Sequence, residues 1–325
     1  MKKLTYLEAS REGLAEMMRS DTSVWTLGED LGRGGVFGQY HGLQKEFGED
    51  RIVDTPISES CILGAAVGAA MMGTRPVVEM RFADFGLCAI DELVNQAAKA
   101  RYMFGGQARV PIVVREPSGM WRSSAAQHSQ SLESWYTHIP GLIIIMPSSP
   151  QDNKALLKAA IRSDDPVVYL EHKDLWNLEG EINDDEDIEI GQARILQTGT
   201  DITIISWSAM TIQSVEAAKK LAAKNISAEV IDLRTLWPWD KKTVFKSIQK
   251  TKNVVIVHEA VRVSGFGAEI SATIAEKMFT QLQLPPLRLG APRIPISYTP
   301  SLENEVKITA EQITQETLKH LREGE

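Results

Sequence analysis

The sequence predicts an α/β protein with two parallel-sheet, three-layer domains, and three observations carry that prediction. Short runs of apolar, often β-branched residues alternate with segments of helical periodicity, which is typical of parallel sheets covered by helices on both faces. The chain has 325 residues, more than one hydrophobic core usually serves. An acidic stretch over residues 177–187 separates a first set of alternating segments from a second set.

The first domain is predicted over residues 1–180 and begins with a helix that has Thr5 and Glu8 at capping-box spacing. Five apolar runs predict strands that are buried on both faces. These runs are residues 24–27, 76–80, 110–114, 142–146 and 167–170, and the helices expected between them are residues 60–72, 89–103 and 153–161. Ser149 and Pro150 form a plausible cap and first turn for the last of these helices.

The second domain is predicted over residues 195–325, after an acidic linker at 181–194 that has little to bury and is expected to be solvated. Its strands are expected at residues 202–206, 228–233 and 254–257, and its helices at 211–224, 244–248 and 267–278. A final amphipathic helix has Thr309 and Gln312 in a second capping box.

Composition excludes several classes of partner. The chain has 35 basic and 43 acidic residues and a net charge of −8, which opposes binding to nucleic acid or to anionic lipid. Two cysteines, Cys61 and Cys88, are too few for a disulfide framework or a zinc site and fit a reducing compartment. With no signal-like or membrane-spanning apolar run, the expected location is the cytoplasm.

Three residues are candidates for chemistry, and each has a structural alternative. Glu59 follows a short strand candidate and starts a helix of small residues, where a ligand could meet it, although acids are also favourable at any helix start. His128 lies in a polar loop and could exchange protons, or it could be a surface or capping histidine. Phe85 could present its ring to a planar ligand or belong to the core.

Several motifs occur together in the order and spacing of a known family. They are DTPISE at residues 54–59, GAAVGAA at 64–70, FADF at 82–85, QHSQS at 127–131 and PGL at 140–142. With them, the sequence resembles the beta subunit of the thiamine-diphosphate-dependent first component of 2-oxo acid dehydrogenase complexes, a group that includes pyruvate, branched-chain 2-oxo acid and acetoin dehydrogenases. The resemblance covers nearly the whole chain. It implies a transketolase-like pyrimidine-binding domain followed by a transketolase C-terminal-type domain.

The resemblance also implies roles for individual residues. Glu59 aligns with the glutamate that hydrogen-bonds the aminopyrimidine ring and so promotes loss of the thiazolium proton. Phe85 falls at the aromatic position beside the pyrimidine, and Ile57 at an apolar wall of the same site. His128 matches a histidine on the reactive side of the cofactor, where it would position the acyl group or the incoming lipoyl group and could transfer a proton.

Cofactors and partners follow from the same resemblance. A Gly-Asp-Gly motif that would hold Mg²⁺ and the diphosphate does not occur in this sequence. The resemblance therefore implies that an alpha subunit carries Mg²⁺ and the diphosphate in an α2β2 heterotetramer, and that a lipoyl-bearing dihydrolipoyl acyltransferase docks on the C-terminal domain. Some relatives bind potassium near the equivalents of Ile112, Ala160, Ile161, Ser163 and Asp165. Ser163 and Asp165 depart from the commonest pattern, so both outcomes for potassium stay open.

The leading interpretation is an enzyme subunit that decarboxylates pyruvate and reductively acylates lipoyl-lysine. Residues 101–106 look like those of acetoin-cleaving relatives, so acetoin and branched-chain 2-oxo acids remain alternatives. A non-catalytic scaffold subunit is disfavoured because both Glu59 and His128 are retained. A nicotinamide-dependent dehydrogenase is disfavoured because the Gly-x-Gly-x-x-Gly fingerprint after a first strand is absent.

Overall fold

The computed structural model describes residues 2–322 and divides the chain into two units. The first unit comprises the chain up to Ser118 together with Trp135–Ile190, and the second comprises Gly119–Ser134 together with the chain from Gly191 onward. Boundaries drawn from the sequence leave residues 119–134 in the first domain. Their contacts group them with the second unit, and this segment carries His128.

Six strands of the first unit lie in one parallel sheet, in the order β6-β7-β5-β4-β2-β3. Their bounds are Val24–Gly28 for β2, Ile52–Asp54 for β3, Arg75–Glu79 for β4, Val113–Ser118 for β5, Ile143–Ile145 for β6 and Val167–His172 for β7. The predicted parallel sheet is therefore confirmed. The strand expected at residues 110–114 begins three residues later and runs to Ser118.

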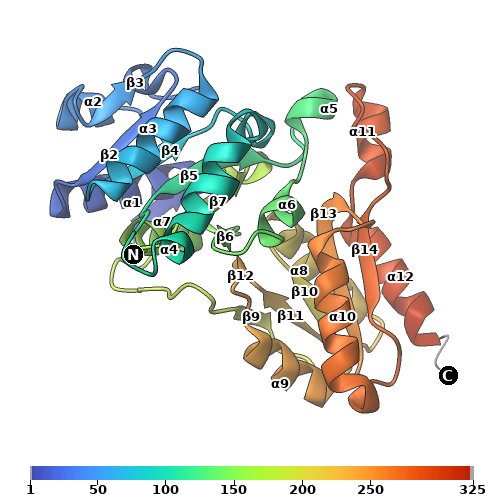
Figure 1. The fold of residues 1–325 in the computed structure, drawn as a ribbon. Helices are drawn as coiled ribbons and strands as arrows, with labels where there is room; N and C mark the ends of the chain where they lie inside the picture. The colour runs from blue at the N-terminus through green and yellow to red at the C-terminus, as the bar shows by residue number, and fades with distance from the viewer. Residues whose placement is uncertain (1, 323–325) are drawn as a thin grey trace. The chain divides into compact units, whose positions relative to one another are not determined.

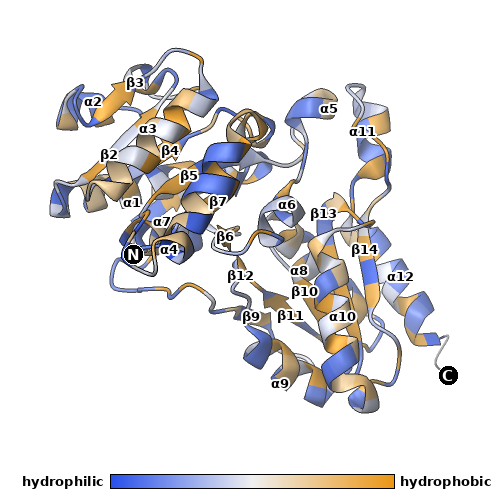
Figure 2. Cartoon of the chain, viewed as in Figure 1, coloured by the Kyte–Doolittle hydropathy of each residue, from blue (hydrophilic) through white to orange (hydrophobic). Residues whose placement is uncertain are grey.

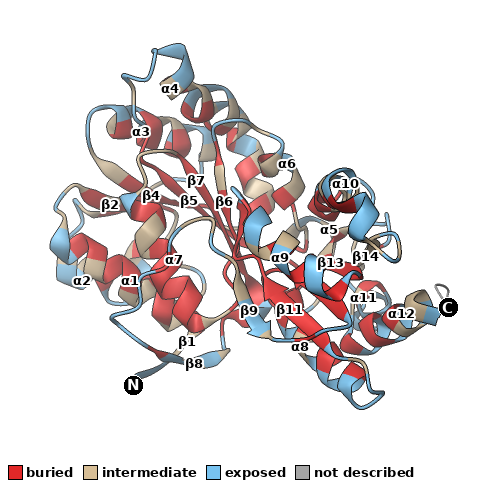
Figure 3. Ribbon diagram, turned by 90° about the horizontal axis from the view of Figure 1, so that it is seen from below, coloured by how far each residue is buried: buried red, intermediate tan, exposed pale blue. Residues whose placement is uncertain are grey.

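Helices cover both faces of this sheet, as predicted. Figure 3 shows α1 (Tyr6–Ser20) and α7 (Pro150–Arg162) on one side, and α3 (Glu59–Met71) and α4 (Ala98–Met103) on the other. The capping box of Thr5 and Glu8 is present, and the Ser149 side chain accepts a hydrogen bond from the Asp152 N–H at 3.2 Å. The helix expected over 89–103 forms in pieces: a 3-10 segment, η2 (Ala83–Ala89), a π-helical segment, η3 (Glu92–Ala97), and then α4.

The acidic stretch is more ordered than the prediction of a solvated linker. Residues Glu179–Ile182 form β8, which pairs in antiparallel fashion with β1 (Lys2–Thr5). Opposite charges face each other across the pair, because Lys3 contacts Glu179. The Ile182 side chain is buried. Residues 183–187 are exposed, as expected, so only the second half of the stretch is a solvated connection.

The interior of the first unit contains a network of charged and polar side chains. The Arg115 guanidinium, 1% exposed, lies 2.7 Å from the Glu171 carboxylate. The Glu79 carboxylate accepts hydrogen bonds from the Tyr40 hydroxyl at 2.8 Å and from the Gln39 amide at 2.9 Å. Removing one partner from such a network leaves a buried group unpaired, so the network fixes how the strands and the overlying loop pack together.

The second unit has a five-stranded sheet in the order β14-β13-β10-β11-β9, parallel except at the β9 edge. The strands are Arg194–Gln197 for β9, Ile202–Ser206 for β10, Ala228–Asp232 for β11, Val254–Val261 for β13 and Leu287–Ala291 for β14. The three predicted strands are confirmed. The edge strands β9 and β14, which are only partly buried, lack the continuous apolar pattern that identifies central strands.

Helices again lie on both sides of this sheet. Figure 3 shows α9 (Lys241–Thr251) and α10 (Phe266–Met278) on one side, and α8 (Ala209–Ala222) and α12 (Ala310–Arg322) on the other. The second capping box is present, since the Thr309 N–H donates to the Gln312 side chain at 3.0 Å and the Gln312 N–H donates back to the Thr309 hydroxyl at 3.3 Å.

Shorter elements complete the fold: α2 (Leu43–Phe47), α5 (Ala125–His128), α6 (Glu133–Thr137), β12 (Thr235–Trp237) and α11 (Pro300–Val306). Hydrophobic residues are concentrated in the strands of both units, while the helices alternate between polar and apolar faces (Figure 2). Among the described residues, every helix is too short or too polar to span a membrane.

Candidate active site

Glu59 is placed by the turn that joins β3 to α3. The strand ends at Asp54, the chain passes through Ile57, and the helix begins at Glu59 with Ser58 as its N-cap residue. Glu59 is half-buried in the first turn of α3, where the free N–H groups favour a negative charge. The Ile57 side chain is 76% exposed, so it does not belong to the core of this chain.

Phe85 lies in η2, which follows β4. Its backbone N–H donates to the Phe82 carbonyl at 3.0 Å, and the two rings have centroids 6.1 Å apart. Phe82 in turn packs edge-on against Phe37, with centroids 5.7 Å apart, and Phe37 packs on Trp176 at 4.1 Å. Phe85 is therefore the half-buried end of a row of aromatic rings, which limits the orientations that its own ring can take.

The fold brings Glu59 and Phe85 to the same edge of one sheet. They follow β3 and β4, whose carboxyl ends meet at one edge because both strands run parallel to β2. Helix α3 packs against η2. Burial raises the pKa of the Cys88 thiol in η2, and the negative charges of Glu59 and Asp84 raise it further, so the two carboxylates lie near this thiol. The Glu59 carboxyl group can hydrogen-bond a ring nitrogen and the Phe85 ring can pack on a flat ring, so together they suit a planar nitrogen heterocycle.

A second carboxyl group, which the sequence analysis did not identify, packs against η2 at Gly86. Glu116, in the second half of β5, is completely buried and accepts a hydrogen bond from the Tyr136 hydroxyl at 3.0 Å. Burial raises the pKa of Glu116 to about 8. A Cβ atom at Gly86 would lie 2.3 Å from its Oε1 atom, so only glycine allows η2 to pack this closely. The available sequence signal was an arginine–glutamate pair, Arg115 and Glu116, directly after the apolar run of residues 110–114.

His128 is the last residue of α5 and belongs to the second unit. It is half-buried. Polar residues next to His128 in the sequence hydrogen-bond with each other: the Gln130 side-chain amide donates to the Gln127 carbonyl at 3.0 Å. His128 therefore lies on a short, hydrogen-bonded loop of the second unit.

The residues expected for potassium lie around the end of α7, and their oxygens already accept hydrogen bonds. The Arg75 guanidinium donates to the carbonyls of Ile161 at 3.0 Å and Ser163 at 2.8 Å. The Ala160 carbonyl accepts from the Ser163 N–H, and the Ile112 carbonyl from the Val167 N–H. The Asp165 carbonyl accepts from the Ser163 hydroxyl, and its carboxylate pairs with Arg101. The Arg75 guanidinium therefore already binds two of the carbonyls expected to hold potassium. Its positive charge disfavours a second cation there, so these oxygens do not fit potassium well.

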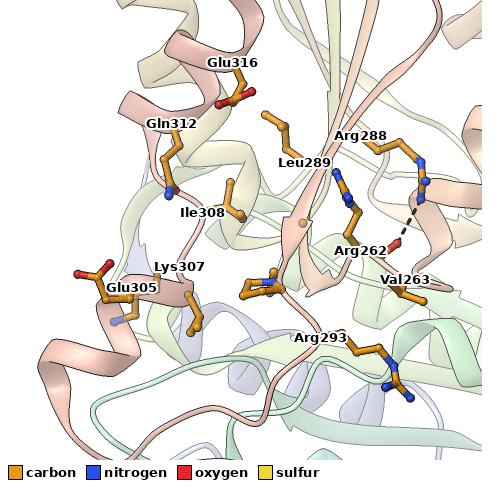
Figure 4. Close-up of a pocket in the computed structure, with 14 residues that line it drawn as sticks. Arg262, Val263, Arg288, Leu289, Arg293, Glu305, Lys307, Ile308, Gln312 and Glu316 are labelled. Atoms are coloured by element: carbon orange, nitrogen blue, oxygen red, sulfur yellow. Dashed lines mark hydrogen bonds between the residues drawn. The ribbon is translucent and has the colours of Figure 1, made fainter.

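A pocket of the second unit has no residue in common with the predicted site. Its volume is about 360 Å³, and Figure 4 shows it between the end of β14, the end of α11 and the start of α12. Four cationic side chains and several apolar ones line it, among them Arg262, Arg288, Arg293, Lys307, Leu289 and Ile308. Glu305 and Glu316 partly compensate the positive charge.

Two family models match the chain. The model for the transketolase pyrimidine binding domain matches residues 2–178, and the model for the transketolase C-terminal domain matches residues 191–313. The chain is 41% identical over 317 residues to the 2-oxoisovalerate dehydrogenase subunit beta of Bacillus subtilis (strain 168), covering 96% of this chain and 97% of that protein. The chain belongs to the beta subunits of the 2-oxo acid dehydrogenase family.

This beta-subunit chain is similar to relatives whose names give different substrates. It is 42% identical over 336 residues to the acetoin:2,6-dichlorophenolindophenol oxidoreductase subunit beta of Cupriavidus necator, covering 99% of each chain. It is 43% identical over 306 residues to the pyruvate dehydrogenase E1 component subunit beta of Rhizobium meliloti, covering 93% of this chain and 66% of that protein. These near-equal identities do not discriminate between substrates.

Solved structures confirm the fold of the beta-subunit chain. A split gene transketolase described as an inactive beta4 tetramer superposes with a TM-score of 0.80 at 20% sequence identity, covering 98% of each chain. A transketolase from Leishmania mexicana superposes with a TM-score of 0.73 at 16% identity and covers 99% of this chain but 46% of that one. At such low identity the likeness concerns the arrangement of helices and strands.

Proposed function

We propose that this chain is the beta half of a thiamine-diphosphate-dependent dehydrogenase that decarboxylates a 2-oxo acid, with pyruvate as the first candidate, and reductively acylates a lipoyl group. The observation that carries the proposal is the Glu59 carboxyl group at the start of α3, on the same sheet edge as Phe85. When bound, thiamine diphosphate supplies the carbanion chemistry that amino-acid side chains lack. The protein's task is to orient the ring system and control its protonation.

Glu59, Phe85 and Ile57 would hold the aminopyrimidine ring. The Glu59 carboxyl group would bind a proton shared with the ring nitrogen, a role that needs an ionisable oxygen rather than an amide. The Phe85 ring, held by Phe82, would set the orientation of the pyrimidine, and the exposed Ile57 side chain would form an apolar wall. The exposed Ile57 side chain and the half-buried Glu59 carboxyl group are both accessible to a ligand, as this assignment requires.

His128 would act in transfer to the lipoyl group. Imidazole changes its protonation near neutral pH, so it can deliver a proton to a departing sulfur or hold the acyl acceptor in place. Its position at the end of α5, on a loop of the second unit, separates it in the chain from the residues that would hold the pyrimidine. We therefore assign Glu59 to cofactor activation and His128 to the later acyl transfer.

The diphosphate and its Mg²⁺ would be held by an alpha subunit. Magnesium requires a set of hard oxygen ligands, and the Gly-Asp-Gly motif expected to supply them is absent from the sequence. The relatives are named as beta subunits, which supports a second type of chain in the enzyme. We propose an α2β2 heterotetramer that binds a lipoyl-bearing acyltransferase through the C-terminal domain, and that works in the cytoplasm.

An apolar helix face supports the need for a partner chain. Cys61, Ala65 and Gly68 of α3 and its C-cap residue Met72 follow one another at helical spacing, and all four are exposed. Met72 is 86% exposed, and Tyr102 and Met103 at the end of α4 are 86% and 72% exposed. A Cβ atom built at Gly68 has nothing within 4 Å, so the small side chain is not required by this chain's own packing. Such a face suits close contact with another subunit.

Gly68→Arg should therefore block assembly without unfolding the chain. The position is helical and open, so arginine should raise the stability of the isolated chain by roughly 0.5–1 kcal/mol through helix propensity. The same side chain would prevent close approach of a partner helix, and we expect association with the alpha subunit to weaken at least tenfold. Sedimentation velocity of the mixed subunits measures this change.

Ala222→Arg is the matched control, because Ala222 is an exposed helical residue of the second unit, at the end of α8. It should assemble normally. Assembly of Gly68→Arg with wild-type affinity would show that this face of α3 is not an interface.

The substrate is best tested by co-expression with an alpha subunit. Pyruvate, branched-chain 2-oxo acids and acetoin should be compared as substrates, because the relatives carry these different substrates in their names. We expect kcat/KM to be highest with pyruvate, and turnover to require added thiamine diphosphate. Turnover with acetoin alone would assign the alternative substrate, and the absence of any thiamine-dependent turnover would support a scaffold subunit.

Potassium is expected to have little effect on stability. The Arg75 guanidinium already donates to the carbonyls of Ile161 and Ser163, and its charge opposes a second cation at the same oxygens. The melting temperature of the assembled enzyme should be the same in KCl and in NaCl of equal ionic strength, as measured by calorimetry. A higher melting temperature in KCl alone would establish the potassium site at Ile112, Ala160, Ile161, Ser163 and Asp165.

A further inference from the structure

The segment that carries His128, Gly119–Ser134, has an unfavourable backbone that must be held by other residues. Arg122, Ser123 and Ala125 all have positive φ values, of 44°, 59° and 62°, a region that residues with a Cβ atom seldom occupy. Residues in such conformations persist where surrounding contacts determine them, and they concentrate at functional sites. The groups that hold this segment therefore control where His128 lies.

A single carboxylate of the second unit holds both ends of the segment. The Glu259 Oε1 atom accepts a hydrogen bond from the Met120 N–H at 2.8 Å and another from the Ser131 hydroxyl at 2.9 Å. The Gly119 N–H also donates to the Gln130 carbonyl at 3.1 Å, so the two ends lie side by side. Hydrogen bonds to a charged acceptor are stronger than neutral ones, and these two close the loop that contains His128.

Glu259 is itself fixed by its neighbour on β13. His258 is fully buried, stacks on Trp207 with centroids 5.4 Å apart, and donates from Nδ1 to the Ala260 carbonyl at 3.0 Å. Burial lowers the pKa of His258 to about 4, so the ring is neutral at pH 7. A Cβ atom at any of three glycines would lie within 2.7 Å of this imidazole, which leaves the strand no freedom to shift. These glycines are Gly265, Gly267 and Gly290.

Two further contacts secure the rest of the segment. The buried Glu303 carboxylate of α11 accepts from the Ser123 N–H at 2.7 Å and pairs with Lys307, also at 2.7 Å. The Trp207 indole N–H donates to Glu133 at 3.3 Å. Figure 1 shows α5 beside α11, in agreement with the bond from Ser123. The segment is thus held at its left-handed turn by Glu303 and near its end by Trp207.

We propose that Glu259 is a positioning residue for His128, closing the loop of residues 119–134 so that the imidazole is held in place for acyl transfer. The inference rests on the proposed function of His128. Glu259 acts through the loop and has no chemical step of its own. His128 is consequently held by the C-terminal unit, even though its motif lies within the first half of the sequence.

The test uses the assembled enzyme with Glu259→Ala. Loss of both hydrogen bonds should increase hydrogen–deuterium exchange at the Met120 amide, a readout that does not depend on the cofactor. Transfer to a lipoyl group should fall about tenfold, in keeping with the cost of misplacing a reacting group. Reduction of 2,6-dichlorophenolindophenol, which does not need lipoyl transfer, should change little. Glu276→Ala, at an exposed position on α10, is the matched control and should leave all three measurements unchanged.

Conservative variants keep the test valid if the alanine variant folds poorly. Glu259→Gln retains an oxygen that can accept both hydrogen bonds, so it should restore most of the transfer activity. Ser131→Ala removes one of the two bonds and leaves the carboxylate in place, and it should give an intermediate loss of transfer. Unchanged exchange at Met120 in Glu259→Ala, or equal losses of transfer in the glutamine and alanine variants, would overturn the positioning role.

A double-mutant cycle separates this inference from the proposed function. In a His128→Ala background, Glu259→Ala should lower transfer by no more than about twofold further, because the group that it positions is already gone. Full additivity of the two losses would reject the positioning role while leaving that of His128 intact. If His128→Ala alone left transfer unimpaired, the proposed function of His128 would fail, and with it the inference for catalysis.

Discussion

Glu59→Gln should lower the rate of proton exchange at the thiazolium carbon of enzyme-bound thiamine diphosphate by about 10²–10⁴-fold, the usual contribution of a positioned acid or base. Glutamine has nearly the same shape and keeps a hydrogen-bonding amide, but it cannot share an ionisable proton with a ring nitrogen. Overall turnover should fall in parallel, because later steps depend on this activation. Quenched-flow exchange followed by proton NMR measures the rate directly.

The fold should survive this substitution. Glu59 is half-buried and begins α3, so the change removes a charge that helix N-termini favour, at a cost of about 0.3–1 kcal/mol. Glu49→Gln, an exposed residue of the same unit, makes the same change in net charge and should exchange normally. Wild-type exchange in Glu59→Gln would contradict the assignment of this carboxyl group and the proposed function with it.

His128→Ala should impair transfer to lipoyl groups by about 10²-fold, a typical effect of losing a general acid or base. Reduction of 2,6-dichlorophenolindophenol with the same 2-oxo acid should fall much less, since it reports decarboxylation without a lipoyl acceptor. The ratio of the two rates, measured on one enzyme preparation, is the relevant quantity, because it cancels differences in assembly and cofactor loading.

His138→Ala is the control for this experiment. His138 is an exposed histidine ten residues further along the chain and is expected to leave the ratio unchanged. Equal losses in both assays for His128→Ala would indicate a general role in binding or folding instead of a role in acyl transfer.

The parts of the fold that were predictable depend on local chemistry. Both capping boxes, Thr5 with Glu8 and Thr309 with Gln312, formed as expected because a cap needs only residues three positions apart. Central strands such as Ile202–Ser206 were identified because a strand buried on both faces must be apolar throughout. Strand β8 escaped the prediction, since it carries two glutamates, and the lysine that pairs with Glu179 is Lys3, 176 residues away in the chain.

The candidate site was only partly predictable for the same reason. Family motifs pointed to Glu59, Phe85 and His128, but Glu116 beneath the Phe85 turn was not recognised, because its partners Gly86 and Tyr136 lie 30 residues before it and 20 residues after it. The guanidinium of Arg75 against the carbonyls of Ile161 and Ser163 was equally invisible. Such contacts depend on how strands and helices are stacked, which periodicity does not encode.

By itself, the sequence determined that this protein has two α/β units, which residues cap its terminal helices, and which family motifs it contains. Only the tertiary structure decided that Glu59 and Phe85 share one sheet edge, and that the loop bearing His128 is held by Glu259 and Glu303 of the second unit. The physical reason is that caps and strand patterns arise among near neighbours in the chain. The position of a loop is set instead by hydrogen bonds to residues more than a hundred positions away.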